Sequence, residues 1–127
     1  MTTVLAVDLG SASGRVLAGT LRDGRLDVTD IHRFKHEARR RDDGTLTWDV
    51  ATMEAETITG LKKALERFPD ARAVSIDTWG VDWAPLDENG ELVGDVVAYR
   101  DERTARTLDA VSYTHLRIWR SRARPSS

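Results

Sequence analysis

The sequence contains no cysteine, which excludes disulfide bonds and cysteine-based metal or thiol sites. It has no apolar run approaching the roughly 18–20 residues that cross a bilayer, and its first residues do not resemble a signal peptide. Its formal net charge of -2 provides no broad basic field of the kind that attracts nucleic acid. We therefore expect a soluble, cytoplasmic protein that binds neither membrane nor nucleic acid.

The 127 residues, 40% of them hydrophobic, suit one domain with a modest core. Near the start, residues 4–7 are apolar, as in a strand buried on both faces, and Asp8 follows. A turn with Gly10 and Gly14 comes next, before a second strand-like run. Backbone N–H groups and serine hydroxyls in such a turn approach an anion closely, and a carboxylate beside it suits a hydrated divalent cation. The pattern favours a nucleotide phosphate loop.

Two known nucleotide-binding patterns do not match this turn. No Gly-Lys-Ser/Thr follows the glycines, so it is not a Walker A loop. Gly10 and Gly14 are not spaced as G-x-G-x-x-G, and a strand follows them, so it is not a dinucleotide fingerprint. An ordinary β-hairpin with a Gly/Ser turn remains the alternative.

After the turn, the sequence predicts two further strands, at residues 15–21 and 25–34. Asp23 and Gly24 between them favour a type I′ hairpin turn, which needs positive φ at both central positions. In the strand expected at residues 25–34, an irregular apolar pattern near its end predicts a bulge or an early end of the strand. We interpret the basic stretch at 32–41 as a solvated loop, with a phosphate or nucleic-acid patch as the alternative.

A helix and a fourth strand are predicted next. Asp49 is a good N-cap, apolar residues recur after it at three- and four-residue steps, and Pro69 ends the pattern. Residues 73–76 resume the buried-strand pattern, with Asp77 at their end. A helix between strands favours a parallel crossover that returns beside the first strand. Because ligands of open α/β sheets bind at the carboxyl ends of strands, we expect Asp8 and Asp77 to face one crevice.

The segment after this fourth strand combines polar and aromatic residues. Trp79 and Trp83 fit either a core or a ligand pocket, and Gly80 between them would let a ligand approach the backbone. Asp82 adds a carboxylate that, like the one before Trp79, is available to bind hydroxyls. An Asn-Gly pair further on predicts a second hairpin, and a dense polar cluster follows at 99–104.

Four blocks of the sequence, taken in order, resemble the amino-terminal part of rhamnulokinases, which belong to the FGGY carbohydrate kinases. They are residues 8–15 (DLGSASGR), 47–50 (TWDV), 76–82 (IDTWGVD) and 98–104 (AYRDERT). The first and last blocks resemble the wider kinase family, and the middle two are similar to rhamnulokinases in particular. The resemblance implies an α/β protein with the actin/hexokinase-like (ribonuclease H-like) ATPase fold. Residues 1–110 would form the front part of its first lobe.

The resemblance also implies a reaction and its site. ATP and Mg²⁺ would be used to phosphorylate L-rhamnulose at its 1-hydroxyl. The metal would lie near Asp8 and the sugar would touch Gly80. We add the hypothesis that Asp77 or Asp82 binds the sugar hydroxyls. The residues implied to bind the ATP phosphates are Ser11, Ala12, Ser13, Gly14 and Arg15.

The family's general base is an Asp in a later Ser/Gly-His-Asp-Thr-like motif. None of His32, His36 and His115 is followed by Asp-Thr, so we expect the base beyond the end of this chain and assign no catalytic residue. Residues 111–127 depart from the family pattern, and we expect a non-native or disordered tail, with a nucleic-acid-binding tail as the alternative.

The predicted function is therefore that of a sugar kinase, present here as a truncated fragment that we expect to be inactive alone. The alternatives are a non-catalytic nucleotide-binding module and an actin-like ATPase of the same fold. No feature of the sequence specifies an oligomeric state.

Overall fold

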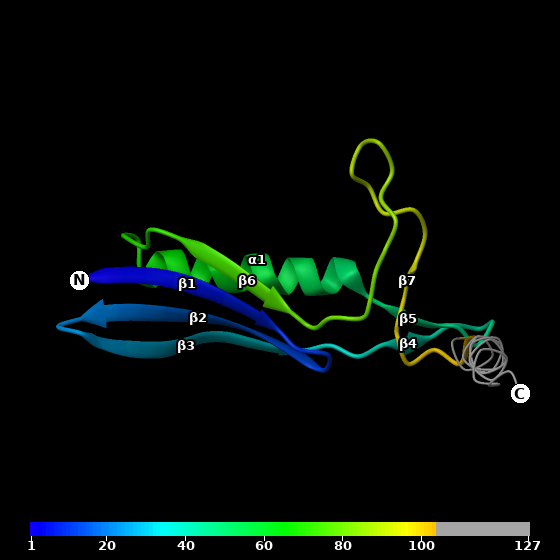
Figure 1. Ribbon diagram of the computed structural model, residues 1–127, viewed down its shortest axis with the longest axis horizontal. Coiled ribbons are helices and arrows are strands. Elements are labelled where there is room, and N and C mark those ends of the chain that lie inside the picture. Colours follow the sequence, from blue (N-terminus) through cyan, green and yellow to red (C-terminus); the bar gives the residue numbers. More distant parts are fainter. Residues whose placement is uncertain (104–127) are drawn as a thin grey trace, which may run out of the picture.

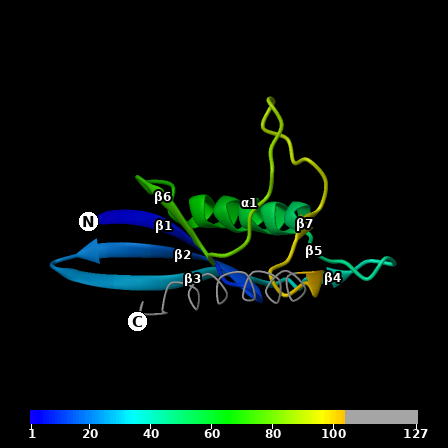
Figure 2. The ribbon, with the colours of Figure 1, turned by 45° about the vertical axis from the view of Figure 1, so that its right-hand side comes forward.

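The computed structural model describes residues 1–103. Residues 104–127, which include the expected tail at 111–127, lie outside the described residues. The elements are β1 (Thr2–Leu9), β2 (Ser13–Arg22), β3 (Arg25–Lys35), β4 (Arg39–Arg40), β5 (Leu46–Trp48), α1 (Val50–Arg67), β6 (Val74–Thr78) and β7 (Val96–Val97). A larger sheet of order β3-β2-β1-β6 carries α1 along one face (Figure 1). A smaller sheet of order β4-β5-β7 lies beyond the carboxyl ends of β1 and β6 (Figure 2).

The first three strands form an antiparallel meander. The turn between β2 and β3 has positive φ at Asp23 (50°) and Gly24 (77°), which confirms the predicted type I′ geometry. Val16 pairs with His32 and the next residue of β2 pairs with Asp30, so Ile31 between them has no partner. The predicted bulge is thus confirmed.

The fourth strand of the sheet arrives by a parallel crossover. β6 pairs with β1 in parallel, from Leu5 with Val74 to Leu9 with Thr78, and α1 lies in the connection. The sequence-based expectation of a return beside the first strand is therefore confirmed. The carboxyl ends of β1 and β6 meet at one edge of the sheet, where the turn between β1 and β2 also lies (Figure 1).

Helix α1 begins and ends where its sequence predicts. The Asp49 side chain accepts a hydrogen bond from the Thr52 N–H at 3.0 Å, as an N-cap does. At the other end, the Phe68 N–H donates to the Ala64 carbonyl at 2.7 Å, and Pro69 follows. The buried residues of the helix are Met53, Thr57, Gly60 and Ala64.

The core lies between α1 and the sheet. Its buried residues are Leu5, Val7, Val16, Ala18 and Ala64, which come from β1, β2 and the helix. They follow the alternation of each strand, so that every second residue faces the helix. Asp8 and Arg15 fall on the opposite, solvent-facing side of β1 and β2 because they are one residue out of step with Val7 and Val16.

The basic stretch at 32–41 is not a solvated loop, and this expectation was wrong. β3 continues through Lys35, His36 is buried, and Arg39 and Arg40 form β4. The three arginines Arg39, Arg40 and Arg41 remain exposed and pair with acidic residues, which lets a charged segment run along a sheet.

The predicted second hairpin is present only in reduced form. Leu86 and Leu92 form one isolated antiparallel bridge, and Gly90 alone of the Asn-Gly pair has positive φ, at 84°. The turn therefore lacks the two left-handed residues of type I′ geometry.

No helix within residues 1–103 is long and apolar enough to cross a membrane.

Candidate functional site

The turn between β1 and β2 is closed by backbone hydrogen bonds and is exposed at its tip. The Gly10 N–H donates to the Ser13 carbonyl at 2.9 Å, and the His36 N–H donates to the Ala12 carbonyl at 3.3 Å from the segment after β3. Ala12 and Ser13 are exposed. The turn is thus held by the segment after β3, while its tip at Ala12 and Ser13 remains accessible to a ligand.

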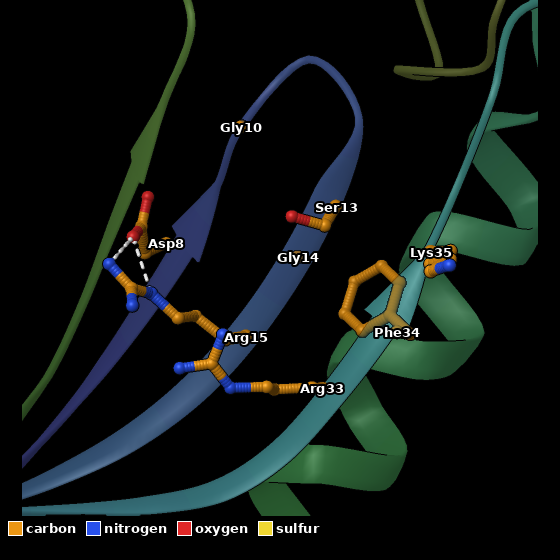
Figure 3. A pocket seen from close by; sticks show the side chains of 8 residues that line it. All are labelled: Asp8, Gly10, Ser13, Gly14, Arg15, Arg33, Phe34 and Lys35. Atoms are coloured by element: carbon orange, nitrogen blue, oxygen red, sulfur yellow. Dashed lines mark hydrogen bonds and ion pairs between the residues drawn. The ribbon is translucent and has the colours of Figure 1, made fainter.

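Asp8 and Arg15 face each other across the two strands. They are register partners, and both Nε (2.8 Å) and Nη2 (2.7 Å) of Arg15 contact Oδ2 of Asp8. Their side chains are 43% and 42% exposed, so the pair is held in place but still reaches solvent. Both contacts use one oxygen of the carboxylate, which fixes its orientation beside the turn (Figure 3).

A hollow of about 620 Å³ lies beside this pair and the turn. Its lining residues are Asp8, Gly10, Ser13, Gly14, Arg15, Arg33, Phe34 and Lys35. Figure 3 shows the Ser13 hydroxyl and the Asp8 carboxylate on the same side of the hairpin. The hollow is lined by three cationic side chains, one hydroxyl and the backbone of two glycines. These groups together suit a phosphate group.

Sequence reasoning missed the contribution of β3 to this hollow. Arg33 pairs with Arg15 in the register between β2 and β3, and Lys35 pairs with Ser13. The only available signal was the basic character of the stretch at 32–41, because register between distant residues is a property of the folded sheet.

Gly14 is required for packing as well as for access to its backbone. A Cβ at this position would lie 2.2 Å from Cζ of Phe34, so the ring occupies the space that any larger residue would need. Phe34 is itself buried and belongs to a second core cluster with Trp48 and Met53. The absence of a side chain at Gly14 therefore lets the Phe34 ring of β3 pack against the start of β2.

Asp77 stands beside Asp8. The two are register partners on the parallel strands β1 and β6, so their side chains project from the same face of the sheet. Asp77 is exposed, and its Oδ1 accepts the Thr78 N–H at 3.0 Å. The structure thus places both carboxylates at one edge, as the strand order predicted.

Of the residues predicted for the sugar side, Asp77 lies in β6, and Gly80 and Asp82 lie on the segment after it. None of the three lines the 620 Å³ hollow. Gly80 is open, because a Cβ there would meet nothing within 4 Å. Asp82 instead accepts hydrogen bonds from two indoles, Trp48 Nε1 at 2.8 Å and Trp79 Nε1 at 2.6 Å. Trp83 is 74% exposed and is not a core residue.

A second hollow, of about 270 Å³, also borders the turn. It contains the remaining two residues predicted to bind ATP phosphates, Ser11 and Ala12. Tyr99 and Arg100 line it from the segment after β7. Two hollows with no lining residue in common therefore border different parts of the predicted phosphate loop.

The acidic residues fit a magnesium ion held jointly with a ligand. Within residues 1–103, no group of three or more His, Asp or Glu side chains is arranged to hold a metal alone. Mg²⁺ is usually bound through one or two carboxylates together with phosphate oxygens and water. Asp8, with Asp77 beside it, matches that arrangement.

Four aspartates away from the site have pKa values below the usual range. Backbone N–H groups are the main cause in each case: Thr45 for Asp43, Thr52 for Asp49, Glu91 for Asp87 and Leu46 for Asp101. Such hydrogen bonds favour the ionised carboxylate. They stabilise turns, the helix start and the junction between the smaller sheet and the chain after it.

Comparison with curated proteins finds rhamnulokinases. The chain is 38% identical over 109 residues to the rhamnulokinase of Bacillus subtilis, which covers 86% of this chain and 22% of that protein. It is 42% identical over 106 residues to the rhamnulokinase of Klebsiella pneumoniae strain 342, with 82% of this chain and 22% of that protein covered. The chain thus spans less than a quarter of the length of these relatives. No protein-family model matches it.

Solved structures show the fold. A gluconate kinase from Lactobacillus acidophilus superposes with a TM-score of 0.74 at 10% identity, over 94% of this chain and 24% of that one. A ligand-bound xylulose kinase from the same organism gives a TM-score of 0.72 at 10% identity, with the same coverage. The strand order and crossover are those of the actin/hexokinase-like sugar kinases. In sequence, the chain is similar to the amino-terminal part of rhamnulokinases, and its fold is that of the sugar kinases.

Proposed function

We propose that this chain forms the phosphate-binding turn and part of the acceptor side of an ATP-dependent kinase that phosphorylates L-rhamnulose at its 1-hydroxyl. The observation that carries the proposal is the hollow beside the Asp8–Arg15 pair, in a chain whose relatives are rhamnulokinases. Phosphoryl transfer depends mainly on positioning and on neutralising charge, and this hollow has the groups for both.

On the phosphate side, the backbone of the turn and its serine hydroxyls would hold phosphate oxygens. The ATP-binding residues that we propose are Ser11, Ala12, Ser13, Gly14 and Arg15. Arg33 and Lys35 add positive charge from β3. Mg²⁺, when bound near Asp8, would neutralise charge on the phosphates.

On the sugar side, we propose that the ketose lies against the backbone at Gly80, where a Cβ would meet no atom of residues 1–103 within 4 Å. Asp77 or Asp82 would supply a carboxylate to the sugar hydroxyls. A base must also accept the proton of the attacking hydroxyl, and we assign that role to no residue of this chain. Residues 1–127 alone are therefore expected to lack transferase activity.

The test is ADP release by a full-length rhamnulokinase carrying this segment, measured with and without L-rhamnulose. ADP release that requires the sugar would support the kinase. ATP binding without ADP release would favour a nucleotide-binding module, and ADP release independent of the sugar would favour an actin-like ATPase.

A further inference from the structure

Three aromatic rings meet behind the phosphate turn. The ring centroids of Trp48 and Trp79 are 5.0 Å apart, and those of His36 lie 5.7 Å from Trp48 and 5.6 Å from Trp79. The imidazole stacks on Trp79 and meets Trp48 edge-on. We call these three residues the aromatic box. They come from three separate parts of the chain: the segment after β3, the end of β5 and the segment after β6.

One carboxylate oxygen holds two sides of this box. Asp82 Oδ2 accepts the indole N–H of Trp48 at 2.8 Å and that of Trp79 at 2.6 Å. Within residues 1–103, no basic side chain forms an ion pair with Asp82, so these indoles are its charge-stabilising partners. Hydrogen bonds to an ionised acceptor are roughly twice as strong as neutral ones. Asp82 therefore orients both rings.

The aromatic box joins the two halves of the proposed site. His36 donates its backbone N–H to Ala12 in the phosphate turn at 3.3 Å. Trp79 donates its backbone N–H to Leu9 at 3.2 Å, and Gly80 is the next residue. A shift of either indole would therefore move the segment that carries Gly80 relative to the turn.

We propose that Asp82 is a positioning residue, which holds the Gly80 segment at a set distance from the phosphate turn through Trp48 and Trp79. This inference rests on the proposed function and distinguishes its two acidic candidates. Asp77 is exposed beside Asp8 and can meet a ligand directly, whereas Asp82 acts through the rings that it holds. A displacement of about 1 Å between reacting groups is enough to slow transfer roughly 10²-fold.

The first test is spectroscopic and uses the 127-residue chain. Replacing Trp83 and Trp119 with Phe leaves Trp48 and Trp79 as the emitting residues. In this background, Asp82→Ala is expected to shift the emission to longer wavelength and to increase acrylamide quenching. Asp82→Asn keeps an acceptor oxygen and is expected to restore most of the parent spectrum. Glu88→Ala, an exposed carboxylate on the same segment, is the matched control and should change nothing. An unchanged spectrum in Asp82→Ala would overturn the proposal.

The second test uses a full-length rhamnulokinase carrying this segment. Asp82→Ala is expected to lower kcat for L-rhamnulose at least tenfold, while the KM for the sugar and the Kd for ATP stay within twofold, and Asp82→Asn should recover most of the loss. A rise in the sugar KM with kcat intact would instead make Asp82 a sugar ligand and overturn the proposal. Equal losses of ATP binding and transfer, with a lower Tm, would reduce Asp82 to a purely structural role and also overturn it. If the unsubstituted kinase makes no rhamnulose-dependent ADP, the proposed function fails and the positioning role with it. The emission measurement does not depend on activity. A shift in Asp82→Ala would then show that the Asp82 contacts are present and that only the proposed function has failed.

Discussion

Asp8 and Arg15 show how one pair of charges serves two purposes at the residue scale. The pair orients the carboxylate at the carboxyl end of β1, and it brings a guanidinium to the edge of the hollow. Half-exposed ion pairs of this kind add little to stability, at most about 1 kcal/mol. We therefore expect the pair to matter more for the proposed function than for folding.

Asp8→Asn should reduce turnover in the full-length kinase by roughly 10²-fold, because a charge-positioning group is lost at the phosphates. Sugar binding should change little. Steady-state kinetics at saturating ATP and Mg²⁺ measure both effects, and Asp27→Asn, an exposed residue on β3 far along the sheet, is the control. Unchanged turnover would contradict a role for Asp8.

Gly80 offers a substitution that adds volume without a clash inside the chain. A Cβ there meets nothing within 4 Å, and its φ is not in the left-handed region. Gly80→Val should therefore leave Tm unchanged but raise the KM for L-rhamnulose about tenfold or more, since added methyl groups fill the space against which the sugar lies. The KM for ATP should stay nearly constant. A matched rise for both ligands would indicate a folding defect instead.

Asp101 links the smaller sheet to the chain that follows it. It is buried, and its pKa is held below the usual range by the backbone N–H groups of Leu46, at 2.7 Å, and of Arg103, at 3.0 Å. A carboxyl with a lowered pKa in the folded state stabilises the fold above its unfolded pKa of about 3.9 and loses that effect as the pH falls through the folded value.

Asp101→Asn should therefore lower the free energy of unfolding at neutral pH and weaken its fall between about pH 5 and pH 3. Urea unfolding at several pH values measures both. Glu88→Gln, on the exposed segment before β7, serves as the control. A variant that keeps the full acid dependence of the parent would show that other carboxylates govern it.

At the scale of elements, α1 packs closely against the sheet at Gly60. A Cβ on Gly60 would lie 2.4 Å from Cγ2 of Val16 and 3.1 Å from Cβ of His32. Val16 is fully buried, and its branched side chain has little freedom to move away. This glycine thus sets the distance between helix and sheet, and through β2 it supports the turn.

Gly60→Ala should destabilise the fold, although Ala is the better helix former by about 1 kcal/mol. Overpacking against Val16 costs about 1–3 kcal/mol, which outweighs that gain. Chemical denaturation of Gly60→Ala, Val16→Ala and the double variant measures the coupling, and the penalty of the alanine should disappear when Val16 is shortened. Thr59→Ala, exposed on the same helix, should be close to neutral. A stabilised Gly60→Ala variant would contradict the close contact.

At the scale of the whole molecule, the described part of the chain, residues 1–103, covers the larger sheet with a helix on one face only. Exposed apolar residues follow its other face and its β6 edge: Val4, Leu21, Leu26, Val28, Val74 and Ile76. Uncovered apolar surface and an open strand edge favour association with other protein. The chain also spans less than a quarter of the length of the curated relatives it matches.

We therefore expect purified residues 1–127 to release no ADP in response to L-rhamnulose and to bind ATP weakly at most. Coupled ADP detection and equilibrium binding measure the two quantities. The Asp8→Asn variant of the same chain identifies activity from a contaminating kinase. Turnover that this substitution abolishes would mean that a base lies within the chain after all.

Local patterns in the sequence determined most of the elements and one half of the site. Asp49 and Pro69 delimit α1, and Asp23 and Gly24 form the turn between β2 and β3. The order of the strands places Asp8 beside Asp77, where the carboxyl ends of β1 and β6 meet. Capping, turn chemistry and buried-strand composition act between near neighbours, so they can be read without knowledge of the fold.

Tertiary structure alone decided the rest, because contacts between distant residues depend on register and packing. Arg33 and Lys35 line the 620 Å³ hollow only because β2 pairs with β3, and the basic run by itself suggested a loop. Asp82 looked like a ligand for sugar hydroxyls in a polar motif, yet in the fold its Oδ2 holds two tryptophans, one of them 34 residues away. A carboxylate can accept hydrogen bonds from a sugar hydroxyl or from an indole N–H. Which of these partners lies beside it depends on how the chain packs.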